Sequence, residues 1–395
     1  MTFWPSVNMR RQDNKRVFFT FLPWLIAGFL FAVFIPLRRK GNLKKIVVFA
    51  QAKIGDFVTQ ISFFHQLKLS LPGSKLTIVL LSEQLKGLIL CDPYVDEIIV
   101  WDEKVIFFKK LKLLFKLMGN RFDAGFNLAI QSWADFILTY ALIPKRISIL
   151  TDAPSGVLKF FYKLSGIHLT LLGVGVYTSQ RYLSMLEYLG VYASNCQPKI
   201  FTCSKDEDYI AEFMLRHDMT KRPRIGVVVQ TDNPLKDMPL NKLIELCRGI
   251  MQRFSGLLVL VGDYKAKEKA RLIKAELGEA VLDTTGVFGL GQLACFLKAL
   301  DVLVSVDSGP VYIAWAVGTA LIDIAGPVDL RERFRPSAKI RLIESDMDCA
   351  PCSFACSPKK ICHSGRRICL EQLDINALLR ELEDILLASK NKDGS

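Results

Sequence analysis

The sequence predicts an α/β protein of two consecutive domains, each with a parallel β-sheet that helices cover on both faces. Two observations predict it: short apolar runs alternate with helical segments in two successive series, and 395 residues are enough for two ordinary domains. Hydrophobic residues make up 51% of the chain, which allows a large core. In two facing Rossmann-like domains, a ligand is expected in the cleft, outside the carboxyl ends of the strands.

The N-terminal segment is both basic and apolar. Residues 1–45 contain nine Lys or Arg and a single acidic residue, and the net charge of the whole chain is +13. Residues 17–37 carry no charge, and a helix of about 20 apolar residues spans a bilayer. We expect a membrane anchor that spans the bilayer or, because Pro23 and Pro36 interrupt it, lies partly in the interface. An apolar helix packed on the domains is the alternative. The basic flank at residues 38–45 favours an inner-membrane protein with its main body facing the cytoplasm.

The first α/β series covers residues 43–218, after an anchor segment at residues 1–42. Residues 45–50 form a continuous apolar run, as expected for a parallel strand buried on both faces. A helix is predicted over 56–71, where apolar residues recur at helical spacing until Pro72 and Gly73 end it. Further strands are predicted over 75–81, 97–101, 124–130 and 146–150, followed by a helix over 206–217.

The second series covers residues 219–372 and begins with a strand over 224–230, which again is a continuous apolar run. Alternating helical and strand segments follow over 240–254, 256–261, 264–277, 289–299, 301–306, 311–317 and 319–325. A last helix over 374–387 belongs to a C-terminal segment, residues 373–395, that ends in a disordered tail. The sequence therefore predicts two doubly wound units.

The ten cysteines fall into two groups. The first is scattered in apolar contexts and is interpreted as small buried hydrophobes in a reducing compartment: Cys91, Cys196, Cys203, Cys247 and Cys295. The second is clustered before the last helix and contains Cys349, Cys352, Cys356, Cys362 and Cys369, with His363. This cluster suggests zinc, although paired CxxC units are absent. The alternative is a structured loop without a metal.

The turn after the first strand carries Gly55 and Asp56. Glycine permits a tight turn from strand to helix, so that Asp56 lies at the start of the helix. Asp is a preferred residue at helix starts, and a capping role is therefore the simplest interpretation. The alternative is a functional carboxylate that faces the cleft.

A candidate anion site follows the strand at residues 301–306, in the phrase Asp307-Ser308-Gly309-Pro310. Proline suits the first turn of a helix, and the free N–H groups of a helix N-terminus bind phosphate. The hydroxyl of Ser308 and the backbone of Gly309 would join them, because glycine lets a ligand approach closely. A purely capping role is the alternative.

The loop at residues 231–236 is the third candidate. It follows the first strand of the second series and carries Thr231 and Lys236. A hydroxyl and an ammonium group on such a loop suit a pyrophosphate. A solvated loop is the simpler interpretation of the same residues.

In their order along the chain, these phrases resemble glycosyltransferase family 9, the ADP-heptose:lipopolysaccharide heptosyltransferases, over residues 43–389. Each phrase alone is weak, but their shared order and spacing make a strong match. The phrases are KIVVFAQAKIGDFV, CDPYVDEIIVWD, SQRYLSMLEYLGV, QTDNPLKDMPLNK, LDTTGVFGLGQLACFLKALD and, the most specific, VSVDSGPVYIAWAVGTALIDIAGPVD.

The resemblance implies a GT-B fold and an enzyme without a cofactor or metal. It implies inverting transfer of a heptose or related sugar from an ADP-sugar to the lipopolysaccharide core or a similar lipid-linked saccharide. By the same resemblance, Asp56 is the base that takes the proton of the acceptor hydroxyl. Asp56 could alternatively act mainly by electrostatics.

The resemblance also implies which residues bind the nucleotide-sugar donor: Thr231, Lys236, Asp263, Asp307, Ser308 and Gly309. Lys236 and Thr231 would hold the departing diphosphate, and Ser308 and Gly309 would bind it at the helix N-terminus. Asp307 would lie nearer the sugar, with Asp263 a candidate for the ribose.

Two residues depart from the family pattern. Tyr312 stands where the family usually has His, and Asp232 takes the place of a Thr. They keep two alternatives open, a GT-B transferase for another nucleotide sugar and an inactive, membrane-tethered glycolipid-binding protein. Residues 104–118 form a basic amphipathic stretch that could touch membrane or acceptor, or be a plain surface helix.

Other classes of function find little support in the sequence. No G-x-G-x-x-G or Walker phrase is present, which argues against a dehydrogenase or a P-loop enzyme. The basic residues cluster beside an apolar span, which argues for a membrane and against nucleic acid as the partner.

Overall fold

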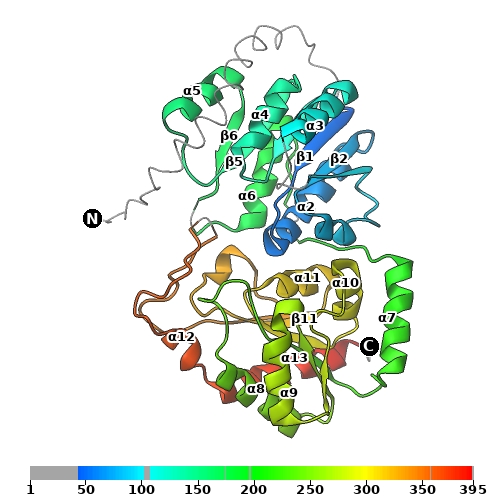
Figure 1. Cartoon of the computed structure of the whole chain (residues 1–395), viewed down its shortest axis with the longest axis vertical. Coiled ribbons are helices and arrows are strands. Elements are labelled where there is room, and N and C mark those ends of the chain that lie inside the picture. Colours follow the sequence, from blue (N-terminus) through cyan, green and yellow to red (C-terminus); the bar gives the residue numbers. More distant parts are fainter. Residues whose placement is uncertain (1–42, 102–106, 174, 195–196, 356, 394–395) are drawn as a thin grey trace.

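The computed structural model describes residues 43–101, 107–173, 175–194, 197–355 and 357–393. Figure 1 shows two α/β halves stacked along the long axis of the molecule. Each contains a sheet of six strands, and every pairing between neighbouring strands is parallel. The predicted fold of two parallel α/β domains is therefore confirmed.

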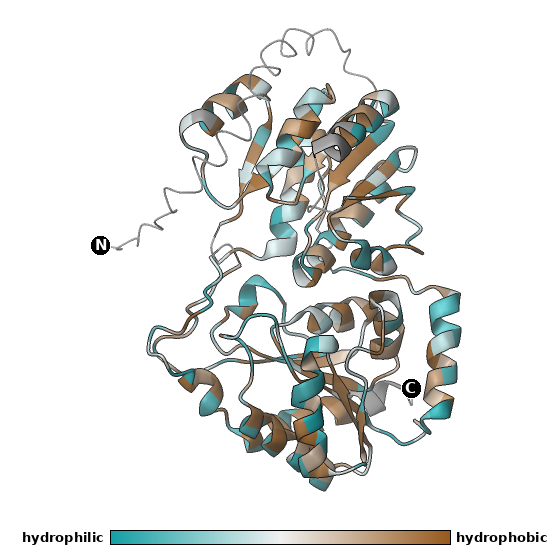
Figure 2. Cartoon of the chain, in the orientation of Figure 1, coloured by the Kyte–Doolittle hydropathy of each residue, from teal (hydrophilic) through white to brown (hydrophobic). Residues whose placement is uncertain are grey.

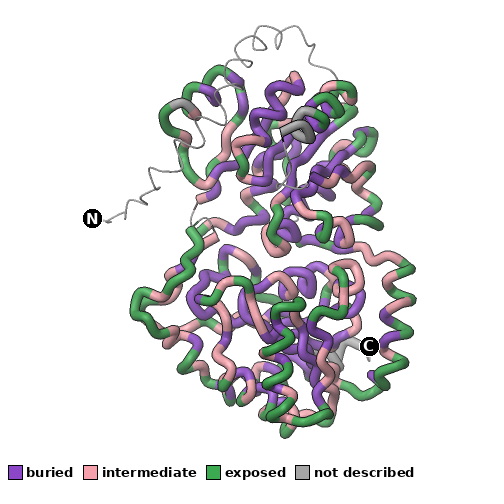
Figure 3. Tube along the Cα trace, in the orientation of Figure 1, coloured by how far each residue is buried: buried purple, intermediate pink, exposed green. Residues whose placement is uncertain are grey.

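The first sheet has the strand order β3-β2-β1-β4-β5-β6. Its strands are β1 (Lys45–Phe49), β2 (Lys75–Leu80), β3 (Glu97–Val100), β4 (Ala124–Asn127), β5 (Lys145–Leu150) and β6 (His168–Leu171). In β1 every residue after Lys45 is buried, because helices cover both faces of the sheet. The brown strands of Figure 2 and the purple strands of Figure 3 show the same pattern in both halves.

The helices of the first half form two layers. They are α2 (Ile54–Ser70), η2 (Glu83–Leu88), α3 (Phe107–Asn120), α4 (Ser132–Tyr140), α5 (Gly156–Ser165), α6 (Thr178–Ser184) and η3 (Met185–Leu189). Ile46 and Val48 of β1 pack in one core with α2 and α6, on the side of the second domain. Val47 and Phe49 point to the opposite face and pack with α3, α4 and α5.

The second sheet has the strand order β12-β11-β10-β7-β8-β9. Its strands are β7 (Arg224–Val228), β8 (Leu257–Val261), β9 (Val281–Asp283), β10 (Val302–Val306), β11 (Ala320–Ile324) and β12 (Ile340–Ile343). Counted within each half, both sheets follow the order 3-2-1-4-5-6, with a switch point between the first and fourth strands. Ligands of such sheets bind at the carboxyl ends of the strands beside that point.

The helices around the second sheet are α8 (Leu240–Arg253), η4 (Tyr264–Ala266), α9 (Lys267–Leu277), α10 (Leu290–Lys298), α11 (Gly309–Val317), η5 (Leu330–Glu332), α12 (Ile368–Glu371) and α13 (Ile375–Asp393). The connecting helix α7 (Ser204–Arg216) packs on α10. The sequence did not predict β6, β9 and β12. All three are short strands at sheet edges, and β6 and β12 are largely half-exposed, so they lack a continuous apolar run.

The two domains share one core. Helices α2 and α11 pack against each other between the sheets, and one cluster of buried residues contains side chains from both halves (Figure 1). A second close contact joins η2 to α10, where a Cβ on Gly87 would lie 2.8 Å from the backbone nitrogen of Gly291. The relative placement of the domains is thus set by packed side chains and backbone.

The predicted membrane anchor at residues 17–37 lies outside the described residues. Within the described ranges, no helix combines the length and the apolar character that crossing a membrane requires.

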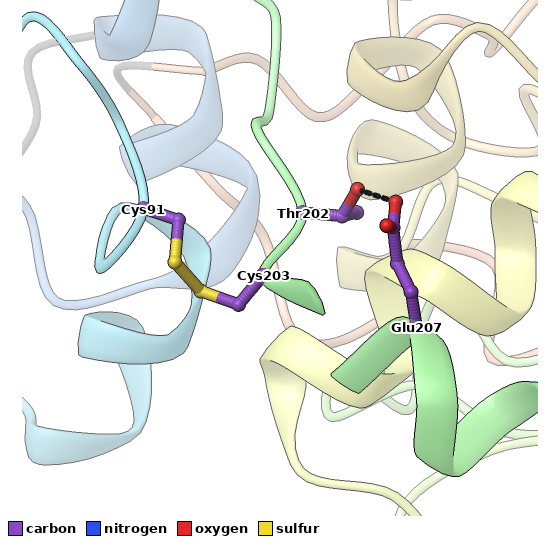
Figure 4. Close-up of a disulfide and its surroundings, with 4 residues drawn as sticks. All are labelled: Cys91, Thr202, Cys203 and Glu207. Atoms are coloured by element: carbon purple, nitrogen blue, oxygen red, sulfur yellow. Dashed lines mark hydrogen bonds between the residues drawn. A yellow bond between two sulfur atoms is a disulfide. The ribbon is translucent and has the colours of Figure 1, made fainter. Parts of the chain in front are cut away.

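The prediction that Cys91 and Cys203 are buried free thiols is wrong. They form a disulfide between positions that are 112 residues apart, with a Cα–Cα distance of 5.5 Å (Figure 4). Cys91 lies in the exposed loop after η2, and Cys203 directly precedes α7, so the fold brings two loop positions together. Cys247 and Cys295 are buried and free, as predicted, whereas Cys196 lies outside the described residues.

Candidate functional site

Asp56 lies in the first turn of α2, just beyond the carboxyl end of β1. The N-cap position belongs to Lys53, and the carboxylate of Asp56 instead accepts a hydrogen bond from Arg333 Nη1 at 3.2 Å. The side chain of Asp56 is 27% exposed. The capping interpretation is therefore replaced by a carboxylate at the domain interface, paired with a cation of the other domain.

Arg333 is a site residue that the sequence did not reveal. It follows η5 in the second domain, and only 11% of its side chain is exposed. Burial opposes its charge, but Tyr312, Asp56 and Asp307 together raise the pKa of its guanidinium. Arg333 is therefore a permanently charged group inside the protein. No motif includes it, and it lies nine positions beyond the end of β11, so no local pattern in the sequence marks it.

Asp307 lies at the carboxyl end of β10 and is buried. It accepts hydrogen bonds from Lys236 Nζ at 2.7 Å and from the Tyr312 hydroxyl at 2.5 Å. Burial alone would raise the pKa of this carboxyl, but the charges of Lys236 and Arg333 and the two hydrogen bonds lower it. Asp307 is therefore ionised, and the predicted residues Lys236 and Asp307 do lie together.

A second carboxyl group, Asp323 of β11, lies deeper beside Asp307. It is fully buried, and burial together with the charge of Asp307 raises its pKa well above the ordinary value. Burial and the neighbouring charge of Asp307 therefore both favour the neutral form of Asp323. The cluster keeps one buried negative charge, on Asp307, in contact with Lys236.

Ser308 and Gly309 begin α11, which faces the first domain. Ser308 makes no cap hydrogen bond, and its hydroxyl lies 2.7 Å from the Ser305 hydroxyl. A Cβ added to Gly309 would lie 3.2 Å from the side chain of Ile54. The N-terminus of α11 thus meets the N-terminus of α2, and both point toward the same part of the interface.

The loop after β7 brings Thr231 near Lys236 in the sequence and in space. The Thr231 hydroxyl donates to the carbonyl of Asn233, and the backbone N–H of Lys236 donates to the same carbonyl. Asp232 forms an ion pair with Lys265 at 2.7 Å, and both side chains are mostly exposed. The carboxylate of Asp232, which departs from the family pattern, is therefore paired with a surface lysine.

Within the described residues, Asp263 makes no hydrogen bond or ion pair with Lys236 or Asp307. Its carboxylate accepts a hydrogen bond from the backbone N–H of Lys265 and caps η4. It does lie at the carboxyl end of β8, beside the strand that carries the Thr231 loop.

The cysteine cluster gives no metal site among the residues that the structure describes. No three His, Cys, Asp or Glu side chains there are grouped as a metal would require. Cys356 lies outside the described residues, and the hypothesis of a zinc site stays a prediction.

The sequence profile described as "Glycosyltransferase family 9 (heptosyltransferase)" matches residues 111–361. This chain belongs to glycosyltransferase family 9. A curated relative, lipopolysaccharide heptosyltransferase 1 of Campylobacter coli, is 32% identical over 114 residues, which are 27% of this chain and 33% of the relative. The alignment thus spans a third of that relative's length.

Three solved structures have the same fold as this chain. The family 9 protein of Veillonella parvula aligns with a TM-score of 0.75 at 21% identity, over 88% of this chain and 98% of that protein. ADP-heptose lps heptosyltransferase II of E. coli aligns with a TM-score of 0.69 at 21% identity, over 88% of this chain and 99% of that protein. E. coli heptosyltransferase WaaC with ADP aligns with a TM-score of 0.63 at 16% identity, over 86% of this chain and 99% of that protein.

Proposed function

We propose that this family 9 chain is an inverting, metal-independent glycosyltransferase. It transfers a heptose or related sugar from an ADP-sugar to the lipopolysaccharide core or a similar lipid-linked saccharide. One observation carries the proposal: Asp56 of the first domain and the Lys236–Asp307 pair of the second are linked through Arg333 at the domain interface. A base and a diphosphate site are the two parts that such a transfer needs.

The chemistry divides between the two domains. Asp56 takes the proton of the acceptor hydroxyl, whose oxygen forms the new bond to the anomeric carbon from the side opposite the departing diphosphate. Lys236 and the N–H groups at the start of α11 stabilise the negative charge that builds on the diphosphate. Removing one preorganised donor of this kind typically costs about 3–4 kcal/mol in the barrier.

The choice of ADP-heptose as donor rests on relatives. Two of the similar structures are, by their descriptions, an ADP-heptose transferase and a heptosyltransferase bound to ADP. Tyr312 favours testing other nucleotide sugars as well, because its hydroxyl contacts Asp307, and the family resemblance implies that Asp307 lies nearer the sugar.

Membrane attachment is part of the proposal. The uncharged residues 17–37, with basic flanks, would anchor the chain to the inner membrane with both domains in the cytoplasm. Lys112 of α3 adds an exposed basic group to the first domain, whereas the neighbouring Lys116 pairs with Glu97. Flotation of the full chain with anionic vesicles, compared with a chain that starts at residue 43, tests this part. Equal flotation of both chains would contradict an anchor at residues 17–37.

The test of the activity is a panel of nucleotide sugars, including ADP-heptose, with the full-length protein and a lipid-linked core saccharide. We expect Asp56→Asn to lower kcat by roughly 10²–10⁴-fold, the usual contribution of a positioned base, while donor binding persists. Asp152→Asn is the matched control, because Asp152 is an exposed carboxylate in the loop after β5. Transfer that is unaffected by Asp56→Asn would contradict the base assignment. Donor binding without transfer by the wild-type chain would favour an inactive, glycolipid-binding protein.

A further inference from the structure

Arg333 occupies an unusual position for a guanidinium group. It belongs to the second domain, only 11% of its side chain is exposed, and within the described residues its hydrogen bond across the interface ends on Asp56 of the first domain. Its Nε–H has no hydrogen-bond partner among the described residues. Leaving a buried donor unpaired costs about 1–3 kcal/mol, so folding stability alone gives no reason to keep an arginine here.

The ion pair leaves half of the Asp56 carboxylate available. Arg333 Nη1 contacts Oδ1, whereas Oδ2 accepts no hydrogen bond from the described residues. A carboxylate in the first turn of a helix can rotate about two side-chain bonds. A fixed cation at one oxygen restricts that rotation and leaves the other oxygen for a hydroxyl group.

We propose that Arg333 is a positioning residue for the transfer reaction, which orients Asp56 so that Oδ2 faces the acceptor hydroxyl. The inference rests on the proposed function. In the step concerned, the acceptor O–H proton moves to Oδ2, the acceptor oxygen bonds to the anomeric carbon, and the bond from that carbon to the diphosphate breaks. The departing diphosphate carries away the electron pair.

The same contact links the orientation of the base to the donor domain. Arg333 lies near enough to Asp307 for the charge of that carboxylate to raise the pKa of the guanidinium, and Asp307 pairs with Lys236. Asp56 is therefore oriented only when the two domains are docked as in Figure 1. A general base that is correctly placed only beside the donor site would take a proton only where a sugar can be transferred.

The experiment combines three variants of Arg333 and Asp56 in the full-length chain. Arg333→Met removes the charge at similar length, and Arg333→Lys keeps a charge without the planar fork of the guanidinium. We expect Arg333→Met to lower kcat by roughly 10²-fold, the scale of a misplaced catalytic group, with less than about a threefold change in donor KM. Arg333→Lys should recover part of the loss. In the Asp56→Asn background, Arg333→Met should cause no further loss, because the two residues act as one unit.

Arg331→Met is the matched control, since Arg331 is 67% exposed, lies two positions earlier and pairs with Asp329. It should leave kcat unchanged. Two results would overturn the inference. The first is a loss of kcat in Arg333→Met that has the same size in the wild-type and Asp56→Asn backgrounds, which would indicate an independent role such as binding the diphosphate. The second is an unchanged kcat in Arg333→Met.

Thermal unfolding of each variant separates misfolding from mispositioning. If Arg333→Met fails to fold, Arg333→Lys is tested alone. A tenfold or larger loss of kcat at an unchanged Tm, which disappears in the Asp56→Asn background, supports the inference. A kcat equal to that of the wild type overturns it. A wild-type chain that transfers no sugar from any donor would instead overturn the proposed function itself.

Discussion

The ring of Tyr312 lies directly against Gly55, across the interface between the two domains. A Cβ added to Gly55 would lie 2.7 Å from Cε2 of that ring and 2.8 Å from Cδ2. The glycine before Asp56 is therefore required by a close approach of the second domain, in addition to the tight turn inferred from the sequence. This contact also connects the proposed base to the proposed donor site, because the Tyr312 hydroxyl donates to Asp307.

Gly55→Ala should displace the Tyr312 ring and weaken its hydrogen bond to Asp307. We expect a loss of about 1–3 kcal/mol in the free energy of unfolding, typical of overpacking, together with a lower kcat. Tyr312→Ala in the same chain should restore part of the stability by making room for the methyl group. Thermal unfolding of the single and double variants measures the coupling. Gly73→Ala is the control, because a Cβ there meets nothing within 4 Å; equal effects of the two alanines would contradict the packing argument.

Lys236→Met should leave the buried carboxylate of Asp307 without its ion-pair partner. Breaking such a pair typically costs about 3–5 kcal/mol, and we expect the lower end because 22% of the Lys236 side chain is exposed. The loss of a donor to the diphosphate should lower kcat by roughly 10²–10³-fold. Adding Asp307→Asn should restore stability without restoring transfer, as measured by chemical denaturation and kinetics. If the double variant regained activity, Lys236 would serve only to neutralise Asp307.

Asp135 of α4 should make the stability of the first domain depend on pH. It is fully buried and accepts hydrogen bonds from the Tyr162 hydroxyl at 2.6 Å and from Ser148 Oγ at 3.0 Å. Burial outweighs these hydrogen bonds and raises its pKa from 3.8 to about 7. The folded protein therefore holds a proton that the unfolded chain has lost. The stabilisation that this bound proton contributes to the free energy of unfolding is fully present below about pH 4. It is lost as the pH rises through the folded pKa of about 7, a change of ~4 kcal/mol.

Asp135→Asn should remove that dependence, because an amide stays neutral and can still accept from Tyr162. Chemical denaturation at several pH values between 4 and 8 measures, for each protein, the slope of the free energy of unfolding against pH. Asp152→Asn is the control at an exposed position and should keep the slope of the wild type. An Asp135→Asn slope equal to that of the wild type would show that Asp135 titrates normally.

The disulfide between Cys91 and Cys203 should stabilise the oxidised protein. It ties the loop after η2 to the start of α7, across a sequence separation of 112 positions (Figure 4). A typical disulfide contributes about 2–4 kcal/mol, largely by restricting the unfolded chain. Dithiothreitol should therefore lower the Tm of the wild type but not that of a Cys91→Ser, Cys203→Ser chain. Thiol titration before and after reduction verifies the bond, and an unchanged Tm on its loss would contradict the expected stabilisation.

Several parts of this protein were determined by local sequence. The long apolar runs of β1, β7 and β10 could be read directly, because central parallel strands are buried on both faces. Asp56, Lys236 and Asp307 were found because each follows such a strand, and the carboxyl ends of parallel strands lie at one edge of a sheet. A residue's place in a βαβ unit thus fixes the side of the domain on which it lies.

Only the tertiary structure decided how these edges meet. Arg333 carries no local signal, and its significance comes from burial against Asp56 of the other domain, more than two hundred positions away in the chain. The Gly55–Tyr312 contact and the Cys91–Cys203 bond likewise join distant segments. The physical reason is that strand and helix periodicity record which face of an element is buried, whereas contacts between domains depend on how two finished surfaces pack.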